Sequence, residues 1–582
     1  MPKIEVNEAL FFNLLGAKYD YDSLEEKLTC AKAELDEKPD PSLAEAERSI
    51  KIELNDTNRP DLWSTAGIAR QLRMHNGLAK SADYSSFLST EKKNLPTNEG
   101  LKNKTDRFIK VDPALKDIRP FMTAFLISGK PIDEHMLVDI IQTQEKLCWN
   151  YGRKRRSIAM GVYRSQLIEW PVQYKACDPD KRRFIPLASE SEMSLREINK
   201  EHPKGKDFGW IIENEKLFPL IVDAKDEVLS MPPVINSAKL GAVEVGDSDL
   251  MVEMTGTDMD SLLLATNIVA CDFFDAGYTI LPVRVEHPYE TGYGKTITTP
   301  FYFQKTTQAR LSAINTLLGH NLTKDEVQEA LTKMDCQVSI EEKEGESLFT
   351  LTPPAYRNDF LHEVDIIEDV AIGKKLSFFT PEKPHDFTIG RLLPLTLFSR
   401  KAKSLMVGLG YQEMIFNYLG SKRDYIDRMN ISADSVIEVA NPMSENYQFV
   451  RPSIIPSLLA AEAVSANAVY PHNIFEIGKV AFLCDEENTG TRTRQNLGFV
   501  SLSQDANFNT GASEVAALLY FLGHEYKVKE SDDPRFIKGR QALVFKGETE
   551  VGIFGEIHPQ VLENWDIGVP CFACELDLEE LI

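Results

Sequence analysis

A single hydrophobic core cannot serve a chain of 582 residues, so the sequence predicts several separately folded domains. At roughly 150 residues per domain, this length corresponds to about three to five of them. Apolar residues make up 43% of the chain and charged residues 26%, which is ordinary for a globular protein and argues against wholesale disorder or a fibrous repeat. The formal charge of −24 argues against a protein that coats nucleic acid through bulk charge, but a local basic patch remains compatible with it.

The eight cysteines are scattered along the chain, which indicates a reduced, intracellular protein and not a disulfide scaffold. Cys571 and Cys574 form one C-x-x-C, but no second pair lies nearby to complete a zinc site, so we expect two partly buried thiols on a strand. The N-terminus lacks the pattern of a secretory signal, and no run reaches about 18 apolar residues. We therefore expect a cytoplasmic protein with no membrane contact.

Apolar periodicity and turn residues predict an α+β multidomain chain. We expect an N-terminal α/β domain at 1–80, a large mixed domain at 107–270, a small α/β domain at 300–375 and an α+β domain at 390–582. Residues 81–106 are rich in Ser, Asn, Lys and Thr and are expected to form a linker.

Local patterns give the first and third domains their expected elements. In the first, strands are expected around Ile4 and across 50–54, and helices follow Asn7, start at Ser23 and run over 62–72. In the third, we expect a helix with a capping box from Thr323 to Glu326, a strand from Val338 and a helix over about 362–372.

The sharpest chemical pattern is a group of carboxylates on the last of these helices. Asp365, Glu368 and Asp369 stand at positions i, i+3 and i+4, which brings them onto one helical face, and Asp359 lies six residues before Asp365. A divalent cation such as Mg²⁺ would relieve their mutual repulsion, since it prefers oxygen ligands. From the spacing alone, a solvated acidic face is the somewhat better interpretation.

Other motifs are less specific. The segment Thr291–Thr296 ends in Gly-Lys-Thr but lacks the first glycine of a phosphate-binding loop, so a hairpin turn is expected there. The basic stretch Arg153–Arg156 is compatible with RNA binding or with a solvated loop. Asn236 and Asp258 follow or flank turns and either line a cleft or cap local structure. No pattern of a common nucleophilic hydrolase is present.

Several stretches, in order, resemble the β subunit of phenylalanyl-tRNA synthetase, in its shorter archaeal and eukaryotic-like form. They cover nearly the whole chain and comprise Asn58–Leu62 with Gly67–Arg70, Gln144–Leu147 with Gly152–Arg156 and Gly161, Met231–Ser237, Pro353–Asp359 with His362–Ala371, Phe475–Gly478, and Gly555–Pro559. One departure is Tyr163-Arg164, where the archaeal-like pattern usually has His-Asp.

The resemblance implies an enzyme subunit. With an α partner, in an expected α₂β₂ assembly, the chain would attach phenylalanine to tRNA(Phe) using ATP and Mg²⁺. The synthetic site and bound ATP are expected on the α partner, and residues 390–582 resemble a degenerate class II synthetase catalytic domain built on an antiparallel sheet with helices. If Glu476 is the motif-two glutamate, Ile474 stands where an active site needs an arginine.

The resemblance also assigns sites. Carboxylates matching Asp359, Asp365, Glu368 and Asp369 hold Mg²⁺ in the family, so these four are the expected metal ligands. Residues 107–270 resemble the domain that hydrolyses tyrosine wrongly attached to tRNA(Phe), with Asn236 and Asp258 as candidates for its site. Editing has a physical reason, because an apolar pocket rejects an added hydroxyl only about a hundredfold. The alternatives are a free-standing tRNA-binding scaffold and a stand-alone editing hydrolase.

Overall fold

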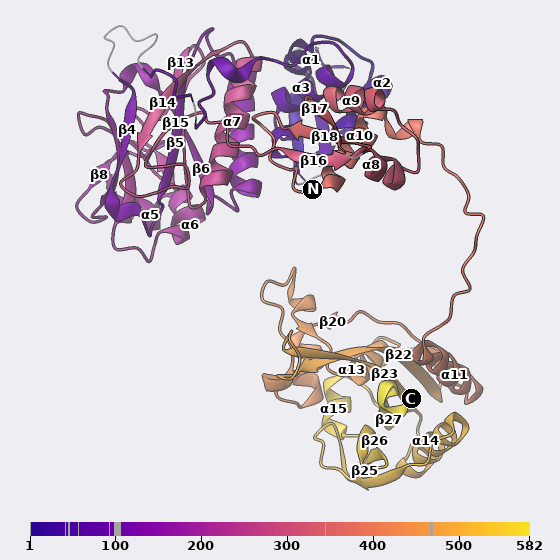
Figure 1. Cartoon of the computed structure of the whole chain (residues 1–582). Coiled ribbons are helices and arrows are strands. Elements are labelled where there is room, and N and C mark those ends of the chain that lie inside the picture. Colours follow the sequence, from indigo (N-terminus) through magenta and orange to yellow (C-terminus); the bar gives the residue numbers. More distant parts are fainter. Residues whose placement is uncertain are drawn as a thin grey trace. The chain divides into compact units, whose positions relative to one another are not determined.

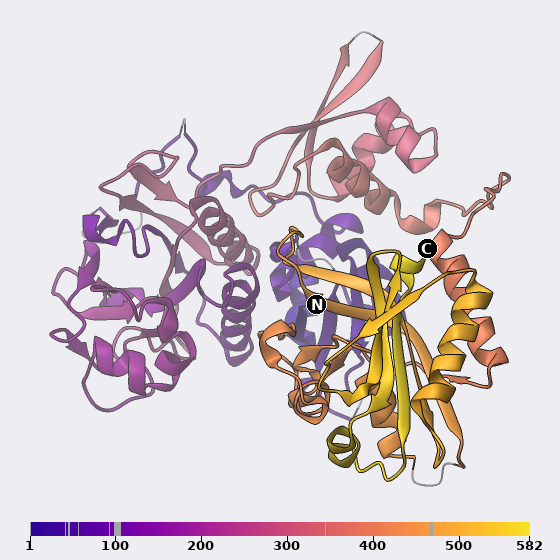
Figure 2. The ribbon, with the colours of Figure 1, turned by 90° about the horizontal axis from the view of Figure 1, so that it is seen from below.

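The computed structural model describes residues 2–40, 42–44, 47–55, 58–91, 93–97, 106–343, 345–465 and 469–582. The chain divides into two compact units, Met1–Glu382 and Lys383–Ile582, and their boundary falls in a proline-containing link between Pro381 and Pro384. Each unit mixes helices and sheets, so the predicted α+β multidomain class is confirmed (Figures 1 and 2). Across the described ranges, no helix has both the length and the apolar character needed to cross a bilayer.

The N-terminal part of the first unit is a three-stranded antiparallel sheet with three α-helices. The strands are β1 (Lys3–Asn7), β3 (Ser49–Leu54) and β2 (Ala33–Glu37) in that spatial order, and the helices are α1 (Glu8–Leu15), α2 (Tyr21–Leu28) and α3 (Thr65–His75). The predicted cap is confirmed, since Asn7 accepts from the backbone N–H of Leu10 at 3.0 Å. The predicted start at Ser23 is wrong, because Asp20 caps α2 and accepts from the backbone of Ser23.

A large curved sheet follows, with the strand order β12-β11-β10-β7-β4-β14-β5-β13-β6 and β15 paired to β14. The strands are β4 (Phe108–Val111), β5 (Phe121–Ser128), β6 (Ile158–Arg164), β7 (Val172–Cys177), β10 (Phe218–Val222), β11 (Val228–Met231), β12 (Ile235–Asn236), β13 (Asp249–Gly256), β14 (Thr279–Glu286) and β15 (Thr296–Thr299). Long helix α7 (Met259–Asp275) packs along β5 and β13 (Figure 1). Gly294 and Lys295 end the loop between β14 and β15, and Thr296 begins β15, so the segment joins two antiparallel strands as the hairpin prediction requires.

Several shorter elements lie between the strands of this sheet in the sequence. They are α4 (Glu134–Lys146), a π-helical turn at Leu147–Tyr151, the pair β8 (Arg183–Phe184) and β9 (Met193–Ser194), α5 (Leu195–Glu201) and α6 (Pro203–Phe208). The predicted linker is wrong for its first half, because Tyr84, Phe87 and Leu88 are buried in the core. Its positions 92 and 98–105 lie outside the described residues, as do 56 and 57 of the turn before α3.

The last part of the first unit is a three-stranded sheet flanked by helices. It contains β16 (Thr307–Arg310), β18 (Glu346–Thr352) and β17 (Gln337–Lys343), with α8 (Leu311–Leu318), α9 (Lys324–Lys333) and α10 (Glu363–Lys374). The capping box of Thr323 and Glu326 is confirmed at the start of α9. The strand predicted from Val338 and the helix predicted over 362–372 are also confirmed.

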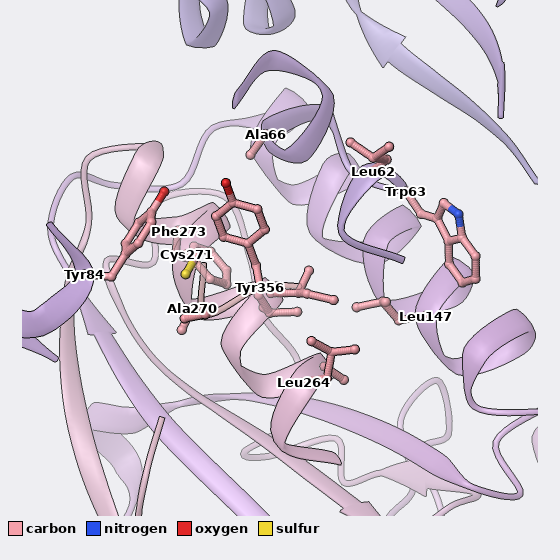
Figure 3. Packing of buried hydrophobic residues seen from close by; sticks show 14 of the residues in the cluster. Leu62, Trp63, Ala66, Tyr84, Leu147, Leu264, Ala270, Cys271, Phe273 and Tyr356 are labelled. Carbon is pink, nitrogen blue, oxygen red and sulfur yellow. The ribbon is translucent and has the colours of Figure 1, made fainter. Parts of the chain in front are cut away.

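One continuous hydrophobic core joins the parts of the first unit. Ala66 on α3, Phe273 on α7 and Tyr356 of the loop before α10 contribute to the same cluster (Figure 3). At its centre, Arg70 ion-pairs with Asp272 and Asp275 at 2.5 and 2.6 Å and lies 4.3 Å from the ring centroid of Tyr356. The N-terminal domain, the large sheet and the small α/β part are therefore held together as one body.

The second unit is built on a seven-stranded sheet that is antiparallel except where β19 meets β22. Its strands are β19 (Gln412–Glu413), β22 (His472–Leu483), β23 (Thr491–Leu502), β27 (Cys571–Asp577), β26 (Thr549–Ile557), β25 (Phe536–Lys546) and β24 (Lys527–Glu530). Its helices include α11 (Pro394–Gly408), α13 (Ile455–Ala463), α14 (Phe508–Leu522), α15 (Pro559–Asn564) and α16 (Leu578–Leu581).

Alternation along β27 divides the core of this unit between the two faces of the sheet. Phe572 and Cys574 join the cluster under α11 and α14, which pack together on one face (Figure 2). Cys571 and Ala573 join the cluster that contains residues of α13 and α15. Both cysteines are buried on a strand, so the prediction of structural thiols is confirmed.

Candidate functional site

The two ends of the large sheet meet around buried polar side chains. β6 is the last strand at one end of the sheet, and β11 and β12 lie at the other end. The hydroxyl of Tyr163 on β6 lies 2.8 Å from Ser230 Oγ on β11, and the backbone N–H of Arg164 donates to the carbonyl of Leu240 at 3.1 Å. The curvature of the sheet therefore encloses the side chains that the two end strands share.

A carboxyl group completes this arrangement, which we call the Tyr163–Glu253 cluster (Tyr163, Ser230 and Glu253). Tyr163 Oη donates to Glu253 Oε1 at 2.8 Å, and all three residues are buried. Gly161 lies opposite Glu253 in the β6–β13 register, and a Cβ there would collide with both the phenol and the carboxyl group. The missing side chain at Gly161 is thus what lets Tyr163 reach Glu253.

Glu253 has a raised pKa and one carboxyl oxygen without a hydrogen-bond partner among the described residues. Burial raises the pKa of its carboxyl group to about 7, although the hydrogen bond from Tyr163 and the charge of Arg119 oppose the shift. Its Oε2 atom has no hydrogen-bond partner in the part of the chain that the structure describes. Such a carboxyl group can accept a hydrogen bond from a hydroxyl when ionised and donate one when protonated.

Arg119 connects this cluster to the basic stretch. Its guanidinium group donates to Thr255 Oγ1 at 2.9 Å, to the Thr255 carbonyl at 2.6 Å and to the Arg156 carbonyl at 2.9 Å. The side chain is almost completely buried, and burial lowers its pKa. Three hydrogen bonds from one planar group fix the end of β13 against the segment that contains Arg156.

Of the two predicted editing residues, Asp258 lines a large cleft and Asn236 does not line it. Asn236 lies on β12, half-buried, with its amide 3.4 Å from the carbonyl of Val162. Asp258 caps α7, accepts from the backbone N–H of Ser261 at 2.8 Å and lines a cleft of about 1530 Å³. The structural role of Asp258 is therefore that of a helix cap at the wall of a cleft.

Sequence reasoning missed the Tyr163–Glu253 cluster. Two signals could have found it: Glu253 is the one charged residue among the apolar positions 250–254, and Tyr163 is a departure from the family pattern. A lone carboxylate in a buried strand is expected to have a partner or a function.

The acidic residues around α10 form ion pairs and backbone hydrogen bonds. Buried Arg357 donates to Asp359 at 2.6 and 3.0 Å and to Asp369 at 2.6 and 3.1 Å. Asp365 accepts from the backbone N–H groups of Leu361 and His362 at 2.7 and 2.6 Å. Glu368 pairs with Lys32 of the N-terminal domain at 2.7 Å.

The donor chemistry of this cluster still suits a divalent cation. Within the described ranges, no three carboxylate, histidine or cysteine side chains are already arranged to hold a metal ion. Asp359, Glu368 and Asp369 nevertheless line one small cavity between α10 and the N-terminal domain. Three carboxylates and three cations line this cavity, so their formal charges balance; the residues are Asp359, Glu368 and Asp369, with Lys32, Arg59 and Arg357.

In the second unit, Glu476 forms a buried ion pair. Arg451 donates to both carboxylate oxygens of Glu476 at 2.7 and 2.9 Å, and both side chains are buried. Ile474, two residues earlier on β22, is also buried in the core. The first cationic residue after Glu476 on β22 is Lys479, three residues later. No cationic side chain directly beside Glu476 on this strand is therefore available to bind phosphates.

Comparisons with known proteins agree over the whole chain. Residues 307–374 match the family model described as the tRNA synthetase B5 domain, and residues 383–578 match the phenylalanyl tRNA synthetase beta chain CLM domain. A phenylalanine–tRNA ligase beta subunit of Treponema pallidum is 47% identical, and one of Borrelia hermsii is 45% identical, with all of both chains covered in each case. An N-terminal fragment of the Pyrococcus horikoshii phenylalanyl-tRNA synthetase beta subunit is 32% identical with a TM-score of 0.56; the match covers 64% of this chain and 99% of the fragment.

The two family models define the class, which is that of aminoacyl-tRNA synthetase subunits. Within it, the chain belongs to the family of phenylalanine–tRNA ligase beta subunits. These two relatives come from bacteria, so the archaeal and eukaryotic-like form is not confirmed by them.

Proposed function

We propose that this chain is the β half of an enzyme that attaches phenylalanine to tRNA(Phe) at the expense of ATP, and that it works only with an α subunit. One observation carries the proposal: 47% identity over the full length of a phenylalanine–tRNA ligase beta subunit. The expected assembly is α₂β₂.

Co-expression with the α subunit of the same genome tests this assembly. The mass of the purified complex, measured by light scattering, should equal two copies of each chain. Two chains that elute separately would contradict the subunit proposal, and a complex of another mass would contradict the stoichiometry alone.

The second unit supports the assignment of synthesis to the α partner. A degenerate class II domain should keep its sheet and lose the cations that bind ATP phosphates. Glu476 is tied to Arg451, Ile474 replaces the expected arginine, and no Arg or Lys follows Lys546 in the sequence. Free β chain should therefore form no phenylalanyl adenylate.

We also propose that the first unit hydrolyses tyrosine wrongly attached to tRNA(Phe). Water would attack the ester carbonyl, releasing tyrosine and the free 3′ hydroxyl of the tRNA. The Tyr163–Glu253 cluster offers the chemistry that distinguishes tyrosine from phenylalanine, because an unpartnered buried carboxyl oxygen gains a hydrogen bond from a phenol and none from a phenyl ring. Asp258 and Asn236 stay candidates for this site.

Deacylation of Tyr-tRNA(Phe) by the α–β complex separates these roles. Glu253→Gln should slow deacylation at least tenfold while phenylalanylation continues. Asp258→Asn retains the helix cap and Asp258→Ala removes it, so a loss in both variants supports a site role, and a loss in Ala alone assigns Asp258 to capping. Wild-type deacylation by Glu253→Gln, Asn236→Ala and Asp258→Ala would overturn the editing proposal.

We propose that Asp359, Asp365, Glu368 and Asp369 hold Mg²⁺. Support comes from their oxygen donors and from the three carboxylates, Asp359, Glu368 and Asp369, that line one small cavity. A bound Mg²⁺ would join α10 to the N-terminal domain. The cation would replace at least one present partner, such as Lys32 on Glu368.

The unfolding midpoint tests the metal site without an activity assay. MgCl₂ should stabilise the wild type by about 2.7 kcal/mol at a hundred times its dissociation constant, and the double variant Asp365→Asn, Glu368→Gln should lose this response. Glu329→Gln on α9, which removes an exposed carboxylate elsewhere, should keep it. Equal Mg²⁺ responses in the wild type and the double variant would exclude these ligands.

We also propose which form of the family the chain represents and in which cellular compartment it works. The Pyrococcus horikoshii fragment, which the chain matches almost completely, favours the archaeal and eukaryotic-like form. All eight cysteines are free, which supports a reducing compartment, and we propose the cytoplasm.

A further inference from the structure

A pocket of about 260 Å³ is lined by α5, α6 and the turn that follows α6, where the two short helices pack against each other (Figure 1). We call it the α5–α6 pocket (Arg196, Lys200, Lys206, Trp210, Glu213 and Phe218). None of these residues lines the cleft at Asp258, so the pocket is a separate place on the first unit. Its volume is close to the lower end of the roughly 300–1,000 Å³ of small-molecule sites, which suits one small ligand.

Close backbone packing holds the walls of the pocket. A Cβ at Gly205 of α6 would collide with the carbonyl of Ile198, and a Cβ at Gly209 would collide with the side chain of Asn199. Asn199 Nδ2 donates to the Gly209 carbonyl at 3.1 Å, which ties the turn after α6 to α5. The pocket is therefore formed before a ligand arrives, and binding requires little further ordering.

An indole ring in the lining is exposed and yet fixed in orientation. Trp210 is 46% exposed, and its Nε1 donates to the carbonyl of Asp207 at 3.1 Å. Aromatic faces held in this way stack on flat unsaturated rings, and every nucleobase presents such a ring. Trp210 therefore favours a ligand with a flat ring.

Two lysines of the pocket lack an anionic partner. Arg196 is neutralised by Asp180, to which it donates at 2.6 and 3.0 Å. Lys200 and Lys206 form no hydrogen bond or salt bridge within the ranges that the structure describes. Glu213 is the single carboxylate among the described lining residues, so the unpaired lysines outnumber it and the pocket attracts an anion.

The excess of positive charge does not extend beyond the pocket. Residues 178–216, the segment that contains α5 and α6, hold nine acidic and eight basic side chains. Single-stranded nucleic acids bind along positively charged grooves that span several nucleotides. Two unpaired lysines in a segment of nearly balanced charge instead suit one phosphate group on a small ligand.

We propose that the α5–α6 pocket binds a free nucleoside monophosphate, with the base stacked on Trp210 and the phosphate between Lys200 and Lys206. Glu213 would accept a hydrogen bond from a ribose hydroxyl, since it forms none with the described residues. The inference goes beyond the proposed function and does not depend on it.

Calorimetric titration of the full β chain with AMP, adenosine and inorganic phosphate tests this site. AMP should bind more tightly than either of its parts. Trp210→Ala should weaken the binding of AMP and of adenosine about tenfold, because both stack a base, and Trp210→Phe should restore most of it. Lys206→Gln should weaken AMP binding about fivefold and leave adenosine binding unchanged, since only AMP carries a phosphate.

Two substitutions outside the pocket serve as controls. Trp149→Ala removes another exposed indole, at the cleft that Asp258 lines, and should change none of the three dissociation constants. Lys181→Gln removes a lysine whose side chain is 84% exposed and should leave AMP binding unchanged.

Several results would overturn the inference. The first is an absence of saturable AMP binding, or equal AMP affinities in the wild type, Trp210→Ala and Lys206→Gln. A loss of AMP binding in Trp149→Ala alone would assign the nucleotide to the cleft, and phosphate that binds as tightly as AMP would leave an anion site only.

A single-stranded adenylate tetranucleotide separates a free nucleotide from RNA. The inference predicts that it binds no more tightly than AMP. Much tighter binding with the same dependence on Trp210 would make the pocket an RNA site and would overturn the assignment of a free nucleotide. None of these outcomes affects the proposed ligase function, which charging of tRNA by the α–β complex tests separately.

Discussion

At the scale of single residues, Glu253 links the candidate site to the stability of the fold. The ordinary pKa of its side chain is 4.5, and burial raises it to about 7 in the folded protein. The folded state therefore binds this proton more tightly than the unfolded state does. The resulting stabilisation is complete below about pH 4.5 and is lost as the pH rises through about 7.

Glu253→Gln should remove this pH dependence, because the amide stays neutral throughout. A shift of this size corresponds to about 3 kcal/mol between the two ends of the range. Urea unfolding of both proteins at about pH 5 and pH 7.5 should give a wild type that loses more stability on going to pH 7.5. Asp139 and Asp272 also have raised pKa values. Both residues are present in the wild type and in the variant, so their contributions cancel when the two pH dependences are compared. Parallel losses would contradict the assigned burial of Glu253.

Residue types alone reveal the carboxylates of α10 but not their partners. The i, i+3, i+4 spacing correctly places Asp365, Glu368 and Asp369 on one helix, yet each accepts hydrogen bonds from a different donor. Arg357 and Lys32 come from a loop and from another domain, and only the tertiary fold brings them to α10. Spacing along one helix cannot predict such contacts.

At the scale of elements, hydrogen-bonding patterns close in sequence were predictable. Asn7 caps α1 and Thr323 caps α9, because each pattern needs only a few consecutive residues. The helix expected from Leu62 instead starts at Thr65, since Ser64 caps it and the preceding residues form a 3₁₀ turn. The linker prediction failed at Tyr84, whose burial depends on α3 and α7 and not on its neighbours.

Packing of α14 against β27 gives a prediction at this scale. Alanine favours helix over glycine by up to about 1 kcal/mol, yet a Cβ at Gly511 would collide with the ring of Phe572. Gly511→Ala should therefore lower the free energy of unfolding by about 1–3 kcal/mol. Gly408→Ala at the end of α11, where no atom lies within 4 Å of the new Cβ, should be neutral or stabilising.

Phe572→Leu, which removes part of the ring, should reduce the cost of Gly511→Ala in a double-mutant cycle. Urea unfolding of the four proteins measures this coupling. Equal effects of the two glycine substitutions would contradict the close approach of α14 to the sheet.

At the scale of the whole molecule, family motifs spread over nearly the full length predicted the function better than any single site did. Composition and charge excluded classes of protein but selected none. The structure adds that the first unit shares one core, so the candidate editing site, the cleft and the acidic cluster belong to one body. The second unit has its own sheet and cores, with its glutamate closed off by Arg451.

The central claim is that this chain is a subunit without synthetic activity of its own. Phenylalanylation of tRNA(Phe), measured with the β chain alone, the α subunit alone and the two mixed, tests it directly. The account predicts charged tRNA only in the mixture. Charging by the β chain alone would contradict the closed site at Glu476, and no charging in a mixture that forms a complex would contradict the ligase function itself.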